Sequence, residues 1–228
     1  SIEGAGYGTT LKTAASQPNA FGRIFRVVGK ENVTIRNLRL DGNKANNNPL
    51  YEQSHNIIVW ESNDVLIEDV ETVDATGDGI IIGGTSVISQ RVRLHRIKGS
   101  GNLRNPVTVN EAADVWINES DLTVPSGSGG QAIDSEPDDL DGYDNLWITN
   151  CKLKHEDADG YALSTGGKSG YPRRNVRVIN CEFGGGIYVY ENDGLLFSGC
   201  WGTMDHIEAI GASNRVTLRD TQFAFGST

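Results

Sequence analysis

Short segments in which apolar and polar residues alternate recur along the whole chain. Residues 32–40 show the pattern most clearly. It returns in residues 64–70, 91–97, 114–117, 145–153, 175–181, 195–197 and 215–220. Alternation with a period of two is typical of a strand, whose successive side chains point to opposite faces. Since the interval between copies varies, from 32 residues between Val33 and Val65 to 19 between Val176 and Leu195, we predict coils with loops of variable length.

A second alternating run precedes most copies of the pattern. These runs are residues 24–28, 57–60, 80–82, 107–109, 132–134, 162–164 and 187–190. The 28 glycines concentrate between strands, where turns need positive φ. No long segment has a helical period. The chain is therefore expected to be all-β: one domain over residues 1–228, a right-handed parallel β-helix of about nine stacked coils that share a core.

Two sets of residues keep a fixed place in the repeat. Cys151, Cys181 and Cys200 each follow the first apolar residue of their copy by five positions, so they should point inward on consecutive coils. We interpret them as small buried residues and not as a disulfide or a metal site. A second set is Asn37, Asp69, Asn150, Asn180 and Asp220. We expect this set to form a ladder of turns in which side chains bond the backbone of neighbouring coils.

The opening residues 2–11, Ile-Glu-Gly-Ala-Gly-Tyr-Gly-Thr-Thr-Leu, resemble the first coil of the pectate-lyase-like parallel β-helix superfamily. The repeated Val-x-Ile-x-Asn phrase resembles the coils of the same proteins, and the resemblance covers essentially the whole chain. It implies the fold. It does not choose a reaction, because the superfamily includes polysaccharide lyases, glycoside hydrolases, uronan epimerases, tailspikes and adhesins.

Charge and the chain ends narrow the set of partners. The formal charge of −10 argues against nucleic acid, which requires basic patches. No apolar run is long enough to cross a membrane. Neither end shows an amphipathic helix that would cap the stack. We therefore expect a fragment of a larger protein, with flanking domains or a homotrimer over the ends, on the cell exterior or a virion surface.

The densest cluster of carboxylates lies in residues 131–139. With Ile133 inward, Asp134 and Glu136 both point outward. The element Ile-Asp-Ser-Glu-Pro at residues 133–137 also resembles an Ile-Asp-x-Glu-Pro element of tailspike-like β-helices. Two carboxyl groups held close raise the pKa of one of them, which provides a proton donor and a base at neutral pH. A spacing of two residues allows a separation of about 5–9 Å, which spans retaining and inverting glycoside hydrolysis.

Other residues complete the expected site. Asp159 or Asp78 would assist catalysis. The substrate-binding candidates are Trp60, Asn110, Tyr188, Tyr190 and Arg173. Aromatic faces in a polar groove suit sugar rings. Asp138 and Asp139 offer hard oxygen ligands that would suit Ca²⁺, so the expected cofactor is either none or calcium.

Three functions follow from this site. Hydrolysis of a polysaccharide by Asp134 and Glu136 is the first, because the negative net charge would repel a polyanion in the absence of Ca²⁺. A Ca²⁺-dependent lyase or a uronan epimerase is the second. A non-catalytic carbohydrate-binding or structural shaft, such as a phage tail or adhesin segment, is the third.

Overall fold

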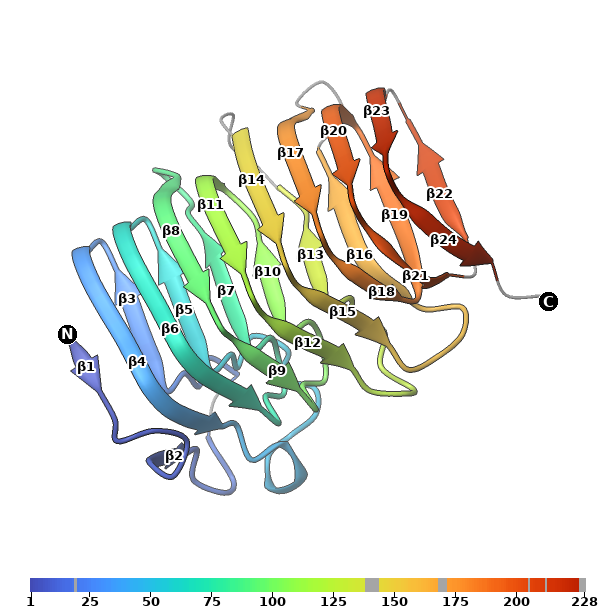
Figure 1. Ribbon diagram of the computed structural model, residues 1–228. Coiled ribbons are helices and arrows are strands. Elements are labelled where there is room, and N and C mark those ends of the chain that lie inside the picture. Colours follow the sequence, from blue (N-terminus) through green and yellow to red (C-terminus); the bar gives the residue numbers. More distant parts are fainter. Residues whose placement is uncertain (19, 138–143, 168–171, 205, 212, 226–228) are drawn as a thin grey trace.

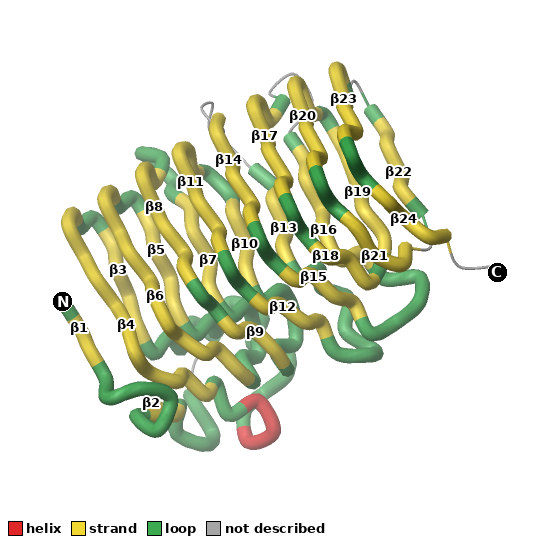
Figure 2. Tube along the Cα trace, in the orientation of Figure 1, coloured by secondary structure: helices red, strands yellow, loops and turns green. Residues whose placement is uncertain are grey.

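The computed structural model describes residues 1–228 apart from residues 19, 138–143, 168–171, 205, 212 and 226–228. Strands stack along one axis into an elongated body, with the first strands at one end and the last at the other (Figure 1). Neighbouring coils pair in parallel throughout the two sheets. Figure 2 shows how much of each coil is strand, and it places the short 3-10 helix η1 (Lys44–Asn46) in a loop of an early coil. The parallel β-helix predicted from the repeat is confirmed.

One sheet, which we call the first face, contains the run that precedes each copy of the repeat. Its strands are β3 (Phe25–Val28), β5 (Ile57–Trp60), β7 (Ile80–Gly83), β10 (Val107–Val109), β13 (Ile133–Ser135), β16 (Tyr161–Gly166), β19 (Gly186–Tyr190) and β22 (Ile207–Ile210). These eight strands correspond to eight coils, close to the nine expected.

The larger sheet bends and provides two further faces. β4 (Glu31–Asp41) and β6 (Asn63–Val73) run through both, and β1 (Ile2–Glu3) and β2 (Thr10–Lys12) pair with β4. The second face continues with β8 (Ser89–His95), β11 (Ala112–Asn118), β14 (Asp144–Thr149), β17 (Arg173–Ile179), β20 (Asn192–Ser198) and β23 (Asn214–Arg219). The third face continues with β9 (Lys98–Ser100), β12 (Asp121–Val124), β15 (Lys152–His155), β18 (Glu182–Gly184), β21 (Trp201–Met204) and β24 (Gln222–Phe225).

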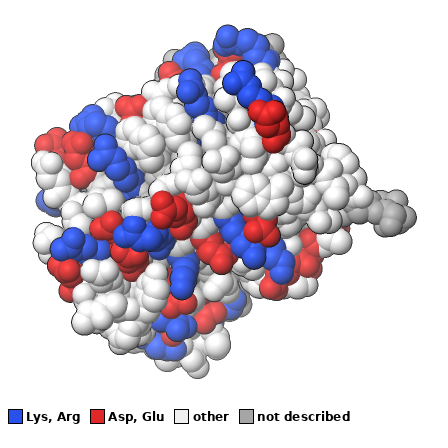
Figure 3. Space-filling view, viewed as in Figure 1, with Lys and Arg blue, Asp and Glu red and all other residues white. Residues whose placement is uncertain are grey.

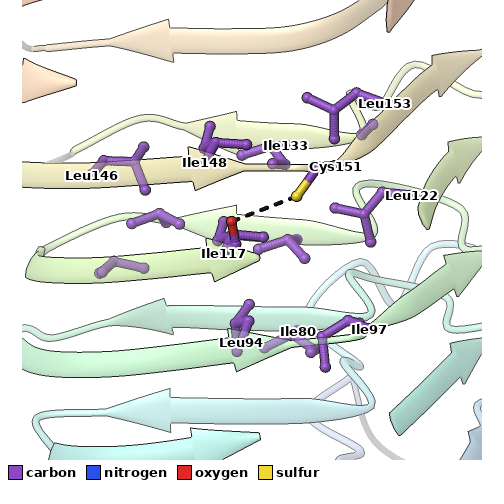
Figure 4. Close-up of a cluster of buried hydrophobic side chains, with 14 of the residues drawn as sticks. Ile80, Leu94, Ile97, Ile117, Leu122, Ile133, Leu146, Ile148, Cys151 and Leu153 are labelled. Carbon is purple, nitrogen blue, oxygen red and sulfur yellow. Dashed lines mark hydrogen bonds between the residues drawn. The ribbon is translucent and has the colours of Figure 1, made fainter. Parts of the chain in front are cut away.

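The core is a set of inward columns shared by successive coils. On the first face, Ile57, Ile80, Val107 and Ile133 pair in register and are fully buried. No coil could bury these side chains alone, so the stacking of coils supplies the hydrophobic stabilisation. Figure 4 shows side chains from several coils meeting in this interior.

The cysteines form the inward column that their spacing predicted. Cys151, Cys181 and Cys200 are buried free thiols. The Cys151 amide lies 3.5 Å from the Cys181 sulfur, and the Cys151 thiol lies 3.5 Å from the Ile117 carbonyl oxygen (Figure 4). These side chains therefore behave as small core residues.

The turn ladder is confirmed, but its bonding differs from the prediction. Asn37, Asp69, Asn150 and Asn180 all have φ between 51° and 57°, a left-handed conformation that Asn and Asp tolerate, and the chain turns there from the second to the third face. The side chains of the first three bond other side chains: Asn37 Nδ2 donates to Glu3, the Asp69 carboxylate accepts from Arg96, and Asn150 Nδ2 donates to Asn118. The backbone amides make the bonds between coils, as in Asn150 N–H to the Ile179 carbonyl at 2.9 Å.

Opposite charges mix on the side formed by the second and third faces. Figure 3 shows this side with Lys and Arg interspersed among Asp and Glu. On the third face, Arg39 lies 3.4 Å from Glu71 and Lys152 lies 3.9 Å from Glu182, each pair bridging adjacent coils. Such exposed pairs stabilise the fold little. Within the described ranges, no helix is long and apolar enough to span a membrane.

Candidate functional site

The first face carries a row of outward side chains that crosses most of the coils. The strand register gives the row as Arg26, Ile58, Ile81, Thr108, Asp134, Ser164 and Tyr188. Adjacent members lie on neighbouring coils, about 4.8 Å apart. Asp134 therefore faces outward, as the alternation predicted. It is nevertheless only 6 % exposed, with Asn105 of the preceding coil and Ser164 of the following coil as hydrogen-bond partners.

Asn105 lies against Asp134, and hydrogen bonds fix the orientation of its side chain. Its Oδ1 accepts a hydrogen bond from the Gln131 amide at 2.7 Å, so its Nδ2 is the donor group. That Nδ2 donates to Thr108 Oγ1 at 2.9 Å and to Asp134 Oδ2 at 3.2 Å. The Asp134 carboxyl is thus held in one position by a rigid neighbour.

The environment of Asp134 favours its neutral form. Burial, and after it the negative charge of Glu136, raise the pKa of Asp134 to about 7. A hydrogen bond from Ser164 and the positive charge of Arg104 oppose this effect, whereas Asp78 adds to it. At neutral pH, a carboxyl group with such a pKa is protonated in a large fraction of the molecules.

Glu136 has the opposite environment. Its side chain is 51 % exposed, and its Oε1 lies 3.7 Å from Arg104 Nη2. The Nε of the same guanidinium lies 3.7 Å from Asp78 Oδ1. Arg104 therefore lies between the buried Asp78 carboxyl and the exposed Glu136 carboxyl and places a positive charge beside both.

Asp78 lies inside the protein and supports this network. It is fully buried, and its Oδ1 accepts a hydrogen bond from the Asn105 amide at 3.1 Å. Its own amide donates to His55 Nδ1 at 3.0 Å, and the same nitrogen lies 3.2 Å from Asp78 Oδ2. Asp78, which the sequence suggested as an assisting residue, acts on Asp134 through Asn105 and through its charge.

A groove of about 360 Å³ runs along the first face beside these groups. It is lined by Arg23, Arg26, Val28, Gln53, His55, Ile58, Trp60, Ile81, Arg104, Thr108, Asn110 and Glu136. Trp60 is positioned by Gly83 on the next coil, since a Cβ at Gly83 would lie 2.6 Å from the indole ring. The Trp60 Nε1–H donates to Thr85 Oγ1 at 3.1 Å. The groove combines an aromatic side chain with polar and charged ones, the composition of many ligand sites.

The structure brings only part of the expected substrate-binding set together. Trp60 and Asn110 share the groove with Glu136. Tyr188 lies in the Asp134 row two coils further along, where its ring packs edge-on against Tyr161 at 5.4 Å. Tyr190 follows on the same strand. The tyrosines and Trp60 are therefore on opposite sides of the carboxylates along the stack.

Arg173 requires a correction. It was expected to contact substrate, but it is 0 % exposed. Its Nη2 donates to the carbonyl oxygens of Val109 and Asn110 at 3.2 and 3.0 Å. The side chain points inward where the chain passes from the first to the second face, so Arg173 holds the backbone behind Asn110 and does not reach the groove.

The remaining predicted residues lie elsewhere. Asp159 is exposed and precedes β16 by two residues, whereas the residue of that coil beside Asp134 is Ser164, five positions further on. Asp138 and Asp139, the suggested calcium ligands, lie outside the described residues. Among the described residues, no group of three or more His, Cys, Asp or Glu side chains is placed to hold a metal ion.

Four residues that line the groove or contact Asp134 and Asp78 were not singled out from the sequence as site residues: Arg23, His55, Arg104 and Asn105. Three of them share a signal, because Arg23, His55 and Asn105 each lie two residues before a strand of the first face. Asp78 occupies the same place before β7. An alignment of the coils on their first strands would have revealed this polar column.

Comparison with known proteins supports the fold. No family model matches the chain, and no curated protein matches its sequence. A structure of the Streptococcus pneumoniae surface protein and adhesin PfbA superimposes with a TM-score of 0.69 at 14 % identity, covering 89 % of this chain and 61 % of that one. A second PfbA structure gives a TM-score of 0.67 at 11 % identity, covering 94 % and 59 %. The chain thus spans about three fifths of the PfbA chains.

A weaker match is the A-module of the Azotobacter vinelandii mannuronan C-5 epimerase AlgE6, with a TM-score of 0.42 at 14 % identity over 99 % of this chain and 83 % of that one. A score this low carries no argument about the site. The matches to PfbA establish a shared parallel β-helix. At these identities they do not transfer a function.

Proposed function

We propose that the protein cleaves glycosidic bonds of a polysaccharide that lies along the first face, with Asp134 as the proton donor and Glu136 as its partner carboxylate. The observation that carries this proposal is the contrast between the two groups. Asp134 has its pKa raised to about 7 by burial and by Glu136. Glu136, two residues away, is open to the groove.

The two environments suit the two roles of glycoside hydrolysis. The neutral Asp134 carboxyl would protonate the glycosidic oxygen as the bond to the leaving sugar breaks. The Glu136 carboxylate would either remove a proton from the attacking water or attack the anomeric carbon itself. The positive charge of Arg104 would stabilise the negative charge of Glu136 beside Asp134. Asn105 would orient the Asp134 carboxyl, which is the proton donor. Trp60 would support a sugar ring along the same groove.

A binding protein without catalysis is the second candidate. It is favoured by one observation: Asp134 is buried and is not among the residues that line the groove, whereas Trp60 is. The fold is shared with PfbA, which is described as a surface adhesin. Under either function we place the protein outside the cell or on a virion surface, with a polysaccharide as its partner. A Ca²⁺-dependent lyase or epimerase would instead need the metal that Asp138 and Asp139 were suggested to hold.

The test is release of reducing ends from a panel of bacterial and plant polysaccharides, with ultraviolet absorbance recorded in parallel to detect unsaturated lyase products. Wild type is compared with Asp134→Asn and Glu136→Gln, with and without EDTA. New reducing ends that both substitutions abolish, without unsaturated products, are expected. Cleavage that survives both substitutions would refute the assignment. Unsaturated products that EDTA abolishes would indicate a metal-dependent lyase. Binding of a polysaccharide in the groove without cleavage would indicate the adhesin-type function.

A further inference from the structure

Two arginines form the end of the groove that is farthest from the carboxylates. Arg26 lies on β3, is exposed and points into the groove. Arg23 precedes the same strand and is partly buried, and its Nη1 donates to the Phe21 carbonyl at 2.9 Å. Its Nε is buried without a hydrogen-bond partner. Across the described ranges, neither guanidinium has a carboxylate within ion-pair distance.

These two cations oppose each other. The pKa of Arg23 is lowered, first by burial and then by the neighbouring charge of Arg26. Two guanidinium groups without a counterion stabilise an anion that binds between them, because the anion removes their repulsion and accepts charge-assisted hydrogen bonds. Carboxylate and sulfate groups match the planar guanidinium in this way.

The strand register fixes the distance from this end to the carboxylates. Arg26, Ile58, Ile81, Thr108 and Asp134 follow one another on five adjacent strands. Four steps of about 4.8 Å place the Arg26 backbone about 19 Å from that of Asp134. The apolar side chains of Ile58 and Ile81 and the ring of Trp60 line the space between. A linear glycan that bridges the two ends would place several sugar units along this path.

The carboxylate end of the groove disfavours a second anion. Glu136 and Asp78 are close enough to raise the pKa of Asp134, and Arg104 lies 3.7 Å from both Asp78 and Glu136. A polymer with a negative charge on every unit would bring one of those charges against Glu136. The overall charge of −10 suggested that polyanions are repelled, but within the groove Glu136 lies at one end and Arg23 and Arg26 lie at the other.

We propose that Arg23 and Arg26 bind the carboxylate or sulfate group of an acidic sugar, and that the ligand is a glycan in which neutral sugars separate this acidic unit from the bond at Asp134 and Glu136. The inference rests on the proposed function only for the position of the cleaved bond. The anion subsite is defined by the groove and its arginines, and it is tested by binding alone.

The experiment measures binding by calorimetry to three probes: fragments of gellan, in which neutral sugars separate the glucuronates; polygalacturonate fragments, which are charged at every unit; and dextran, which is neutral. Wild type is compared with Arg23→Gln/Arg26→Gln. The matched control is Arg177→Gln/Arg219→Gln, which removes two exposed arginines of the second face. Arg26→Gln alone guards against misfolding of the double variant, and thermal melts followed by circular dichroism verify the fold.

Wild type is expected to bind the gellan fragments most tightly, with an affinity that falls as salt rises. Loss of Arg23 and Arg26 should weaken this binding about tenfold or more and remove much of its salt dependence. The control variant should bind as wild type does. Equal affinities in wild type and in Arg23→Gln/Arg26→Gln, a preference for polygalacturonate or dextran, or no binding to any probe would overturn the proposal. If the gellan preference appears but no cleavage is found, the proposed hydrolysis fails and the subsite stands. Cleavage without the preference rejects the subsite alone.

Discussion

Asp134 and Glu136 lie two residues apart on the same face of the solenoid, yet the structure buries the first and leaves the second about half exposed. Asn105 from the preceding coil donates a hydrogen bond to the buried Asp134, whereas the exposed Glu136 lies beside Arg104. With its pKa raised to about 7, Asp134 retains its proton in a large fraction of the molecules near pH 7, and Glu136 is in contact with the groove and with Arg104.

The burial of Asp134 should make stability depend on pH. Its folded-state pKa of about 7 lies above the ordinary value of 3.8, so between these values the folded state binds the proton more strongly than the unfolded state. The stabilisation is therefore lost as pH rises through about 7. Asp134→Asn lacks this proton, and we expect the difference in unfolding free energy between the variant and wild type to shift in favour of the variant by roughly 2–3 kcal/mol from pH 5 to pH 8.

Urea denaturation at several pH values measures this difference. Asp159→Asn, at an exposed position, is the control for the substitution itself. A difference between wild type and Asp134→Asn that stays constant from pH 5 to pH 8 would show that Asp134 is ionised throughout.

Arg104 should set the upper pH limit of activity. A general acid acts only while it is protonated, so activity is expected to fall as pH rises through the pKa of Asp134. The charge of Arg104 lowers that pKa. Arg104→Gln should therefore move the falling limb of the pH–activity profile to higher pH while it lowers the maximal rate. Arg177→Gln serves as the control, and a limb that stays in place or moves to lower pH would contradict the role of Arg104.

Gly83 should control the position of Trp60. A methyl group at Gly83 would overlap the indole ring, at 2.6 Å from its nearest atom. Gly83→Ala is expected to displace the ring, to change the tryptophan fluorescence and to weaken glycan binding about 3- to 10-fold. Gly129→Ala is the matched control, because a Cβ there meets no atom within 4 Å. Unchanged binding in Gly83→Ala would remove Trp60 from the binding surface.

Arg173 and its neighbour Arg174 should differ sharply in their contribution to stability. Arg173→Met removes the hydrogen bonds of a buried guanidinium to the carbonyls of Val109 and Asn110, although the Asn110 carbonyl keeps its bond from the Ala112 amide, and we expect a loss of about 3 kcal/mol or more. Arg174 is exposed, and its ion pair with Asp144, at 3.7 Å, is exposed too. Arg174→Met should therefore change stability by less than about 0.5 kcal/mol. Chemical denaturation compares the two, and equal losses would contradict the structural role of Arg173.

Much of the fold follows from local pattern. Period-two alternation located the strands and correctly placed Ile133 inward and Asp134 outward, because side-chain parity is a property of the strand itself. It did not reveal that Asp134 is covered, since Asn105 and Asp78 reach it from loops of earlier coils. Arg173 was misplaced for a related reason: its side chain turns inward at a corner between faces, where parity no longer applies.

The charge of the groove was also beyond the reach of composition. The net charge of −10 is a sum over the chain, whereas Arg23, Arg26 and Arg104 line one groove. Arg26 lies on β3, Arg23 precedes β3, and Arg104 precedes β10, which is three strands away on the same face. Their convergence depends on the register between coils separated by long loops, and loop length does not report that register.

The most direct test of the proposed chemistry is a titration of the Asp134 carboxyl carbon by NMR, with its signal assigned from the spectrum of Asp134→Asn. A midpoint at about pH 7 in wild type is expected, together with a lower midpoint in Glu136→Gln, because that substitution removes the second-largest cause of the raised pKa. A midpoint near the ordinary value of 3.8 would show that Asp134 is no proton donor at neutral pH and would remove the basis for hydrolysis by this pair. A midpoint that stays at about pH 7 in Glu136→Gln would show that Glu136 does not contribute to the raised pKa.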